Sequence, residues 1–198
     1  MKSQNTAPPD YSNQLLRRLY ATLADEAHWP DVMEEICFGF QACGTALVKH
    51  DFASGQAKII FHCSHFGEAM QRHRDLFSRD PCFTSGAYFK TGSVMLGSEL
   101  ARLAGLVGEK ISHDHFQELG IHHRLYGVLE RSGMSVQFLF LGRPRSKPPF
   151  NAAEKGGFLR FSDFWGRFAT WGKAVMRSYS SAMPLSSCSI TFLLPACS

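Results

Sequence analysis

Two stretches of alternating side chains, each interrupted by a Ser-Gly pair, constrain the fold of this chain more than any other feature. The first covers residues 44–63 around Ser54-Gly55, and the second covers residues 125–141 around Ser132-Gly133. Alternation with a period of two on both sides of a glycine turn is typical of a β-hairpin. Hairpins place neighbouring strands antiparallel, so they exclude an all-parallel sheet.

The second strand of the second hairpin is apolar on both faces. Val136, Phe138 and Phe140 share one face, whereas the other carries Leu139 and Leu141 among polar residues. A strand of this kind is typically buried on both sides. We therefore predict that it lies in the centre of the sheet.

Helical periodicity surrounds the hairpins. Apolar residues at helical spacing predict a first helix over 11–26, with a stripe of Leu15, Leu16, Leu19, Tyr20 and Leu23. Pro30 suits the first turn of a second helix, which we expect Gly44 to end. Further segments are predicted as helices at 68–77, 85–90 and 110–119, a strand at 94–96, a loop at 143–149 and a last helix from Asn151 with Glu154 in a capping box. The stripe of that last helix is Phe158, Phe161, Trp165, Phe168 and Val175.

The order of these segments defines the fold class. Hairpins separated and flanked by helices predict an α+β domain, in which an antiparallel β-sheet carries flanking helices. The chain has 198 residues, of which 44% are hydrophobic and 19% charged, a composition typical of one globular domain. Residues 1–10 are expected to form a disordered leader.

Targeting and redox features point to the cytoplasm. The N-terminus has no apolar stretch to serve as a signal peptide, and no apolar run approaches the ~20 residues of a membrane span. We therefore expect a cytoplasmic protein with no membrane association. None of the six cysteines forms a Cys-x-x-Cys pair, so they are expected to be reduced and mostly buried.

Motifs for catalysis are missing from the sequence. It contains no Gly-x-Ser-x-Gly, P-loop or Gly-x-Gly-x-x-Gly motif. The adjacent His62 and Cys63 point to opposite faces of a strand, which favours a buried cysteine over a nucleophile. An enzyme is not expected, and neither is a cofactor.

Two further groups of residues have a functional and a plain interpretation. His113, His115, His122 and His123 could supply metal ligands, but no Glu or Cys completes a recognised spacing, so chance clustering of surface histidines explains them better. Residues 143–177 carry eight basic and two acidic residues. They could contact nucleic acid, but a charged loop followed by the solvated face of a helix is the favoured interpretation.

A series of short segments resembles one family. The segments are Leu19-Tyr20-Ala21, Trp29-Pro30, the hairpin 50–57, Ser78-Arg79-Asp80-Pro81, Leu119-Gly120-Ile121-His122 and residues 149–154. In this order and spacing they look like the N-terminal sensory region of LuxR-type helix-turn-helix transcription regulators, over roughly residues 14–162. The resemblance implies a PAS- or GAF-like sensor fold over residues 11–180, with a small-molecule effector held between the sheet and the helices. It also implies that the last helix passes the signal to an attached DNA-binding domain.

The resemblance also places the pocket. The candidate ligand-binding residues lie on the middle segments and the central strand: Phe83, Tyr88, Met95, Phe116, Tyr126 and Phe138. Tyr126 and Phe138 are predicted to point into a cavity between the sheet and the helix at 110–119. The alternative is that all six residues are ordinary core.

The C-terminal end departs from the family. Residues 184–198 carry no Lys, Arg, Asp or Glu, so they lack the charge with which a helix-turn-helix meets phosphates. We expect residues 181–198 to be a disordered tail, the DNA-binding domain to be truncated and sequence-specific DNA binding to be lost. The alternative functions are a vestigial fragment or a ligand-free module that forms a homodimer through Phe164, Trp165 and Trp171.

Overall fold

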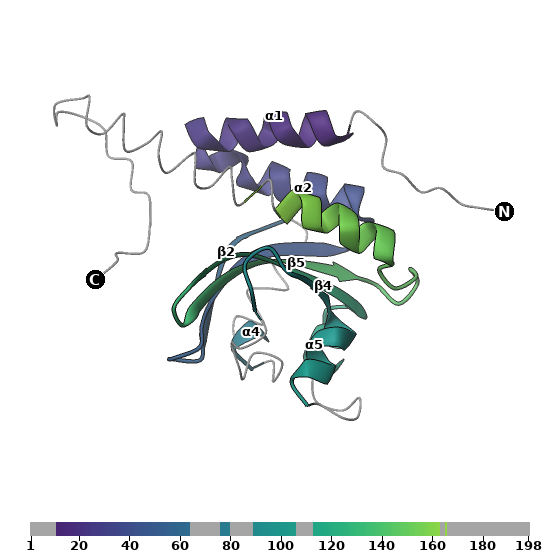
Figure 1. Cartoon of the computed structure of the whole chain (residues 1–198). Helices are drawn as coiled ribbons and strands as arrows, with labels where there is room; N and C mark the ends of the chain where they lie inside the picture. Colours follow the sequence, from purple (N-terminus) through teal and green to yellow (C-terminus); the bar gives the residue numbers. More distant parts are fainter. Residues whose placement is uncertain (1–10, 64–75, 80–88, 106–112, 163–164, 166–198) are drawn as a thin grey trace.

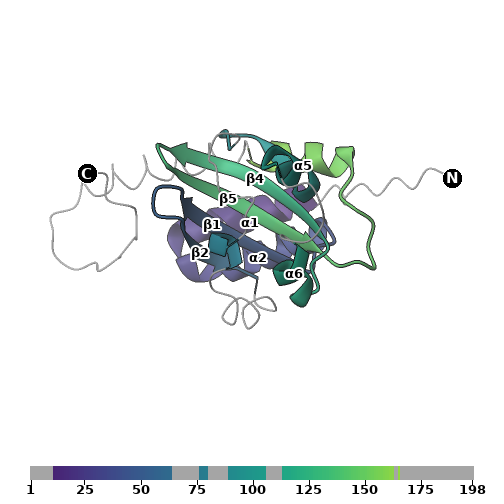
Figure 2. The same ribbon diagram turned by 90° about the horizontal axis from the view of Figure 1, so that it is seen from below.

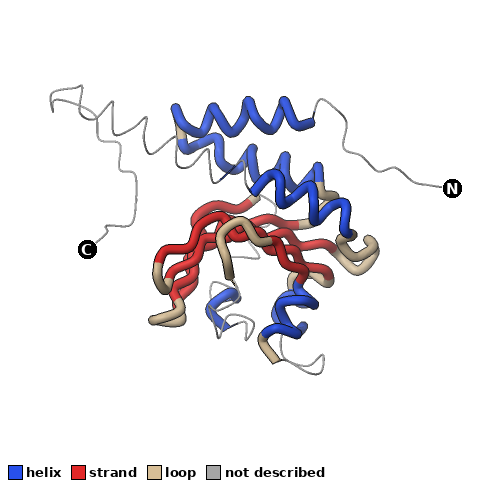
Figure 3. Tube along the Cα trace, viewed as in Figure 1, coloured by secondary structure: helices blue, strands red, loops and turns tan. Residues whose placement is uncertain are grey.

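The computed structural model describes residues 11–63, 76–79, 89–105, 113–162 and 165. Its centre is one five-stranded antiparallel sheet in the order β2-β1-β5-β4-β3. The strands are β1 (Gly44–Asp51), β2 (Gln56–His62), β3 (Val94–Leu96), β4 (His123–Ser132) and β5 (Ser135–Arg143). Helices lie on both sides of this sheet (Figure 3), which confirms the predicted α+β class.

Both predicted hairpins are present. The β1–β2 hairpin closes with Asp51 opposite Gln56, and the β4–β5 hairpin closes with Ser132 opposite Ser135. Gly55 and Gly133 have φ of 67° and 57°, which are costly for other residues, so glycine suits both turns. β5 lies between β1 and β4, so its predicted central position is confirmed.

One face of the sheet, here called the outer face, is covered by α2 (Trp29–Gly39) and the last helix, residues 152–162 (Figure 1). The helix α1 (Tyr11–Ala24) packs on α2, on the side away from the sheet. Leu15 and Leu19 of the predicted α1 stripe are buried, but Tyr20 is 52% exposed, so the stripe is narrower than expected. Pro30 lies in the first turn of α2, where its missing N–H costs nothing.

The opposite face, here called the inner face, is covered by α4 (Leu76–Arg79), α5 (Gly97–Leu103) and α6 (His113–Glu118), seen from below in Figure 2. α6 ends in a Schellman motif, in which the N–H of Ile121 bonds to the carbonyl of Phe116 and Gly120 has φ of 71°. Gly120 therefore ends the helix as predicted. The helix α5 has no counterpart among the sequence predictions.

One sequence prediction is wrong in its detail, namely the residue at which the second helix ends. α2 ends at Gly39 and the chain turns at Gln41, which has φ of 48°, so Gly44 begins β1 instead of ending the helix. A bulge interrupts the β1–β2 register between Leu47 and Val48.

This bulge separates two residues that simple alternation places together. Ile59 pairs with Val48, while Phe61 pairs with Leu47. Val48 and Leu47 are neighbours on β1 and point to opposite faces, so Ile59 and Phe61 do not share a face.

Several predictions fall on residues outside the described part of the chain. These are the leader 1–10, the tail 181–198, most of the helices at 68–77 and 85–90, and the first turn of the helix at 110–119. Within the described residues, no helix has the length and apolar character that crossing a membrane requires.

Candidate functional site

The inner face of the sheet is built by alternation on β4 and β5. Tyr126 pairs with Phe140, and Val128 pairs with Phe138, so these four side chains share one face. All four are fully buried. The ring of Tyr126 lies 5.8 Å from that of Phe138 and 5.4 Å from that of Phe140.

Two short helices add rings to this face. The centre of the Phe77 ring, on α4, lies 5.7 Å from that of Phe138 and 5.2 Å from that of Phe140, and both pairs are edge-on. Phe116 of α6 stacks on Phe140 at 5.3 Å and also meets Phe77 at 5.7 Å. Edge-on and offset-stacked pairs are the arrangements that aromatic rings prefer. Phe77, Phe116, Tyr126, Phe138 and Phe140 thus form one cluster, here called the aromatic cluster.

The aromatic cluster continues towards the β1–β2 hairpin. The centre of the Phe89 ring lies 6.4 Å from that of Phe138 and 5.5 Å from that of Phe52. The Phe52 ring centre in turn lies 4.7 Å from that of His50. His50 is buried, and burial holds its pKa below the ordinary value although the charge of Asp51 acts in the opposite direction. The inner face therefore carries a neutral imidazole at this end.

The other end of the aromatic cluster carries a positive charge. Arg124 lies on the same face of β4 as Tyr126, and its guanidinium is 4.7 Å from the centre of the Phe116 ring, which is a cation–π contact. Gly97 at the start of α5 lies so close that an added Cβ would be 3.0 Å from both Cβ and Nε of Arg124. The aliphatic part of Arg124 is therefore packed between β4 and α5.

Four of the six sequence-predicted ligand residues lie on this inner face. Phe116, Tyr126 and Phe138 belong to the aromatic cluster, and Met95 is buried on β3 opposite Tyr126. Phe83 and Tyr88 lie outside the described residues. The cavity predicted beside Tyr126 and Phe138 stays a prediction, since the described rings there pack against one another.

Sequence reasoning missed Phe77, Phe89 and Phe140. Phe140 carried a usable signal, because it lies two residues after Phe138 and shares its face. Phe77 and Phe89 carried none, since their packing against the sheet depends on contacts with residues that are distant in the sequence.

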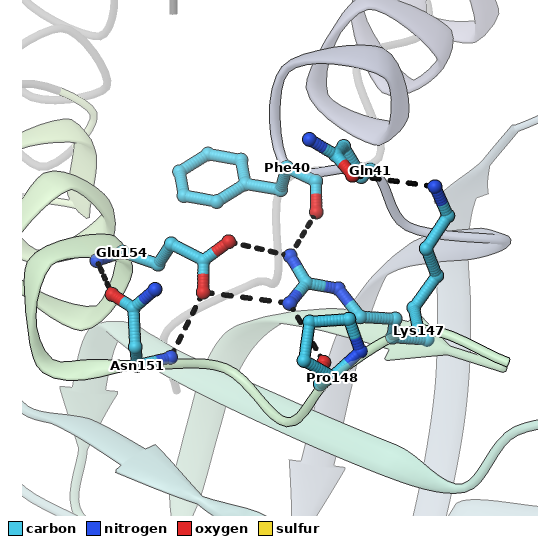
Figure 4. Close-up of polar contacts among 7 residues, drawn as sticks. Phe40, Gln41, Lys147, Pro148, Asn151 and Glu154 are labelled. Atoms are coloured by element: carbon cyan, nitrogen blue, oxygen red, sulfur yellow. Dashed lines mark hydrogen bonds and ion pairs between the residues drawn. The ribbon is translucent and has the colours of Figure 1, made fainter. Parts of the chain in front are cut away.

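On the outer face, the buried side chain of Arg143 connects the sheet to the helices that cover it. Arg143 ends β5, is 2% exposed, and donates hydrogen bonds to the carbonyls of Phe40 and Pro148 and to the carboxylate of Glu154 at 2.7 Å (Figure 4). The interpretation of Arg143 as part of a charged loop is therefore wrong: it is the last residue of β5, and its partners lie just after α2, in the following loop and in the last helix. The predicted capping box is confirmed, with Asn151 and Glu154 exchanging bonds of 2.8 and 2.9 Å.

A row of aromatic rings lies between α2, β2 and the last helix. Trp165 lies 4.9 Å from Trp29 and 5.9 Å from Phe161, and Trp29 stacks on Phe61 at 4.8 Å. Trp165 is 5% exposed. It is therefore part of the core of its own chain, which removes it from the dimer surface that the alternative function would use. The other two residues of that surface, Phe164 and Trp171, lie outside the described part.

Thiols and histidines show no arrangement for chemistry in the described residues. Cys37 and Cys63 are buried, and their mutual hydrogen bond together with burial raises the pKa of the Cys37 thiol. A raised pKa makes a thiol inert, as expected of structural cysteines. No three His, Cys, Asp or Glu side chains among the residues described are grouped to hold a metal ion.

Fold and inner face together define a class of structure: a curved antiparallel sheet with helices on both faces and an aromatic cluster beneath its short helices. The crystal structure of the VqsR LBD domain from Pseudomonas aeruginosa is similar to it, with a TM-score of 0.59 and 13% sequence identity. The similarity covers 82% of this chain and 96% of that one. No protein-family profile matches the sequence, and neither does any curated protein.

Proposed function

We propose that this chain is the signal-sensing domain of a LuxR-type transcription regulator and that it binds a small-molecule effector at the inner face. The observation that carries the proposal is the aromatic cluster together with the short helices α4, α5 and α6 that cover it. Apolar sites lined by aromatic rings with few polar groups are typical of small-molecule pockets. The similarity in fold to a ligand-binding domain supports the same assignment, and we propose a binding domain rather than an enzyme.

The polar groups of this face suggest how an effector is oriented. Arg124 and His50 lie at opposite ends of the aromatic cluster and supply a cationic and a neutral hydrogen-bonding group. Rings between them provide apolar area. A site of this kind suits a molecule with an apolar body and a polar head.

A thermal-shift series tests the proposal. The purified chain is heated with N-acyl-homoserine lactones of several acyl lengths and with simple aromatic compounds. A ligand that binds only the folded chain raises its stability, by ≈ 2.7 kcal/mol at a free concentration one hundred times the Kd. We expect at least one compound to produce a saturable increase.

Two phenylalanine variants locate the effect. Phe138→Leu trims a fully buried ring on the inner face, and Phe158→Leu trims a fully buried ring on the last helix. Both changes are expected to lower the stability of the free chain, but only Phe138→Leu is expected to weaken the response to ligand. Equal responses in the two variants, or no response to any compound, would contradict the proposal.

A further inference from the structure

We propose that the strands β3 and β4 and the helix α5 act as one unit that transmits changes in inner-face packing to the last helix, residues 152–162. The inference rests on the proposed function, because it describes how the sensing face is read out. Two contacts join this unit to the last helix, one through β4 and one around the edge of the sheet.

The first contact is a close approach between β4 and the last helix. An added Cβ at Gly127 would lie 2.6 Å from both the Phe158 ring and the Ser162 hydroxyl. Only glycine leaves this space, so the helix rests directly on the β4 backbone. Phe158 is fully buried there.

The strand β4 also belongs to the inner face. Its residues alternate, so Tyr126 and Val128 lie in or beside the aromatic cluster while Gly127 between them carries the last helix. A single backbone therefore separates the proposed site from the helix. A displacement of Tyr126 by a ligand moves the peptide units on which Phe158 rests, because close-packed interiors transmit strain.

The second contact passes around the β3 edge of the sheet. Glu99 of α5 accepts hydrogen bonds from Lys155 of the last helix at 2.6 and 2.8 Å, although the two helices cover opposite faces (Figure 1). The same carboxylate accepts the N–H of Leu96 at 2.8 Å, where β3 passes into α5. One carboxylate thus joins β3, α5 and the last helix.

The charge state of Glu99 agrees with this role. Partial burial opposes its ionisation, but Lys155 and the Leu96 N–H outweigh that effect and hold the pKa below its ordinary value. Glu99 is therefore a carboxylate at neutral pH. Both side chains of the pair are about one-third exposed, so it acts as a positioning contact more than as a source of stability.

The test uses hydrogen–deuterium exchange of the whole chain without ligand, so it does not depend on finding an effector. Met95→Ala removes packing from the inner face of β3, opposite Tyr126. Val48→Ala removes packing from the same face on β1, opposite Phe138. Exchange of the amides in 152–162 is compared with that of β5, which reports global opening.

Transmission through the unit predicts a selective response. Met95→Ala is expected to speed exchange in 152–162 by about threefold or more relative to β5, whereas Val48→Ala leaves that ratio unchanged. If Met95→Ala does not fold, Met95→Val supplies the same comparison. Equal effects of the β3 and β1 variants would overturn the proposal.

A double-mutant cycle that combines Met95→Ala with Lys155→Met tests the ion pair between Lys155 and Glu99. Lys155→Met removes the ammonium group, and Glu99→Gln keeps an oxygen for the Leu96 N–H while removing the charge. In the Lys155→Met background, Met95→Ala is expected to lose at least half of its effect on 152–162. Arg160→Met, on the same helix, is the matched control and is expected to leave the effect intact.

The outcomes separate this proposal from the proposed function. Additive effects of Met95→Ala and Lys155→Met overturn the route through Glu99. A ligand-induced thermal shift combined with additive effects would leave the sensor in place and remove only the transmission. Selective, non-additive exchange supports the transmission even if every compound fails in the thermal-shift series.

Discussion

Arg143 places a buried positive charge at the end of β5 and shares it among three segments of the chain. Its partners are the carbonyls of Phe40 and Pro148 and the carboxylate of Glu154. The ring of Phe150 also lies 3.9 Å below its guanidinium. The hydrogen bonds all come from the two Nη atoms, because the buried Nε has no partner among the described residues. The charge therefore stabilises the fold only while the Nη hydrogen bonds remain in place.

Removal of the carboxylate is therefore expected to be costly. Glu154→Gln leaves the Arg143 charge buried with weaker partners, and we expect a loss of about 2 kcal/mol in the free energy of unfolding, measured in urea. Lys147→Met is the control, since the Lys147 ammonium group donates an exposed 3.4 Å bond to Gln41, and the change should alter stability by less than about 0.5 kcal/mol. Equal losses in the two variants would contradict this role of Arg143.

His50 links folding to pH. Burial keeps its folded pKa below the ordinary 6.5, so the unfolded chain binds the proton more readily. The contribution of His50 is fully present above the unfolded pKa and is lost as pH falls from that value to the folded pKa.

The expected result is a stability that falls between about pH 7.5 and pH 5.5, with a smaller fall in His50→Gln. Urea unfolding at the two pH values measures it. The lowered pKa values of Asp51 and Glu99 act only at more acidic pH, because carboxylates titrate there. An identical fall in the variant would show that His50 is not responsible.

At the scale of elements, the seat of the last helix on β4 depends on Gly127. Gly127→Ala is expected to push Phe158 and Ser162 away and to cost about 1–3 kcal/mol, the range for overpacking a filled core. Gly156→Ala, in the same helix, adds a methyl group to open space and is expected to stabilise by up to about 1 kcal/mol. Denaturant unfolding of both variants checks the opposite signs, and a stable Gly127→Ala would contradict the close approach.

Elements with a strong local pattern were predictable from sequence. The two hairpins follow from alternation around Gly55 and Gly133, and the last helix follows from its capping box, since each depends on neighbouring residues. α5 was not predictable, because it is seven residues long and Glu99 is held by a lysine 56 positions away. The bulge in β1–β2 also has no local signature.

The site was predictable on the strands and less so elsewhere. Tyr126 and Phe138 follow from strand alternation, and the structure confirms that they share the inner face. Their contacts with Phe77 and Phe116 depend on how α4 and α6 fold back over the sheet. Arg143 is the clearest long-range case, because Phe40 lies 103 positions away and no local pattern connects the two.

For the whole molecule, the proposed function places the small-molecule effector at the inner face of the sheet. Three methionines report on separate regions. Met95 is buried on the inner face, and Met33 is buried on α2, on the outer side of the sheet. Met134 is 53% exposed at the tip of the β4–β5 hairpin. Their methyl groups give a probe for the site and two internal controls.

The measurement is a titration of the ¹³C-methyl-methionine-labelled chain with whichever compound raises its melting temperature, followed by NMR. Signals are assigned by replacing each methionine with leucine. Binding at the inner face is expected to produce a saturable shift of the Met95 signal, with Met33 and Met134 nearly unchanged. Shifts at Met33 or Met134 while Met95 stays fixed would place the ligand elsewhere and contradict a sensing site on the inner face.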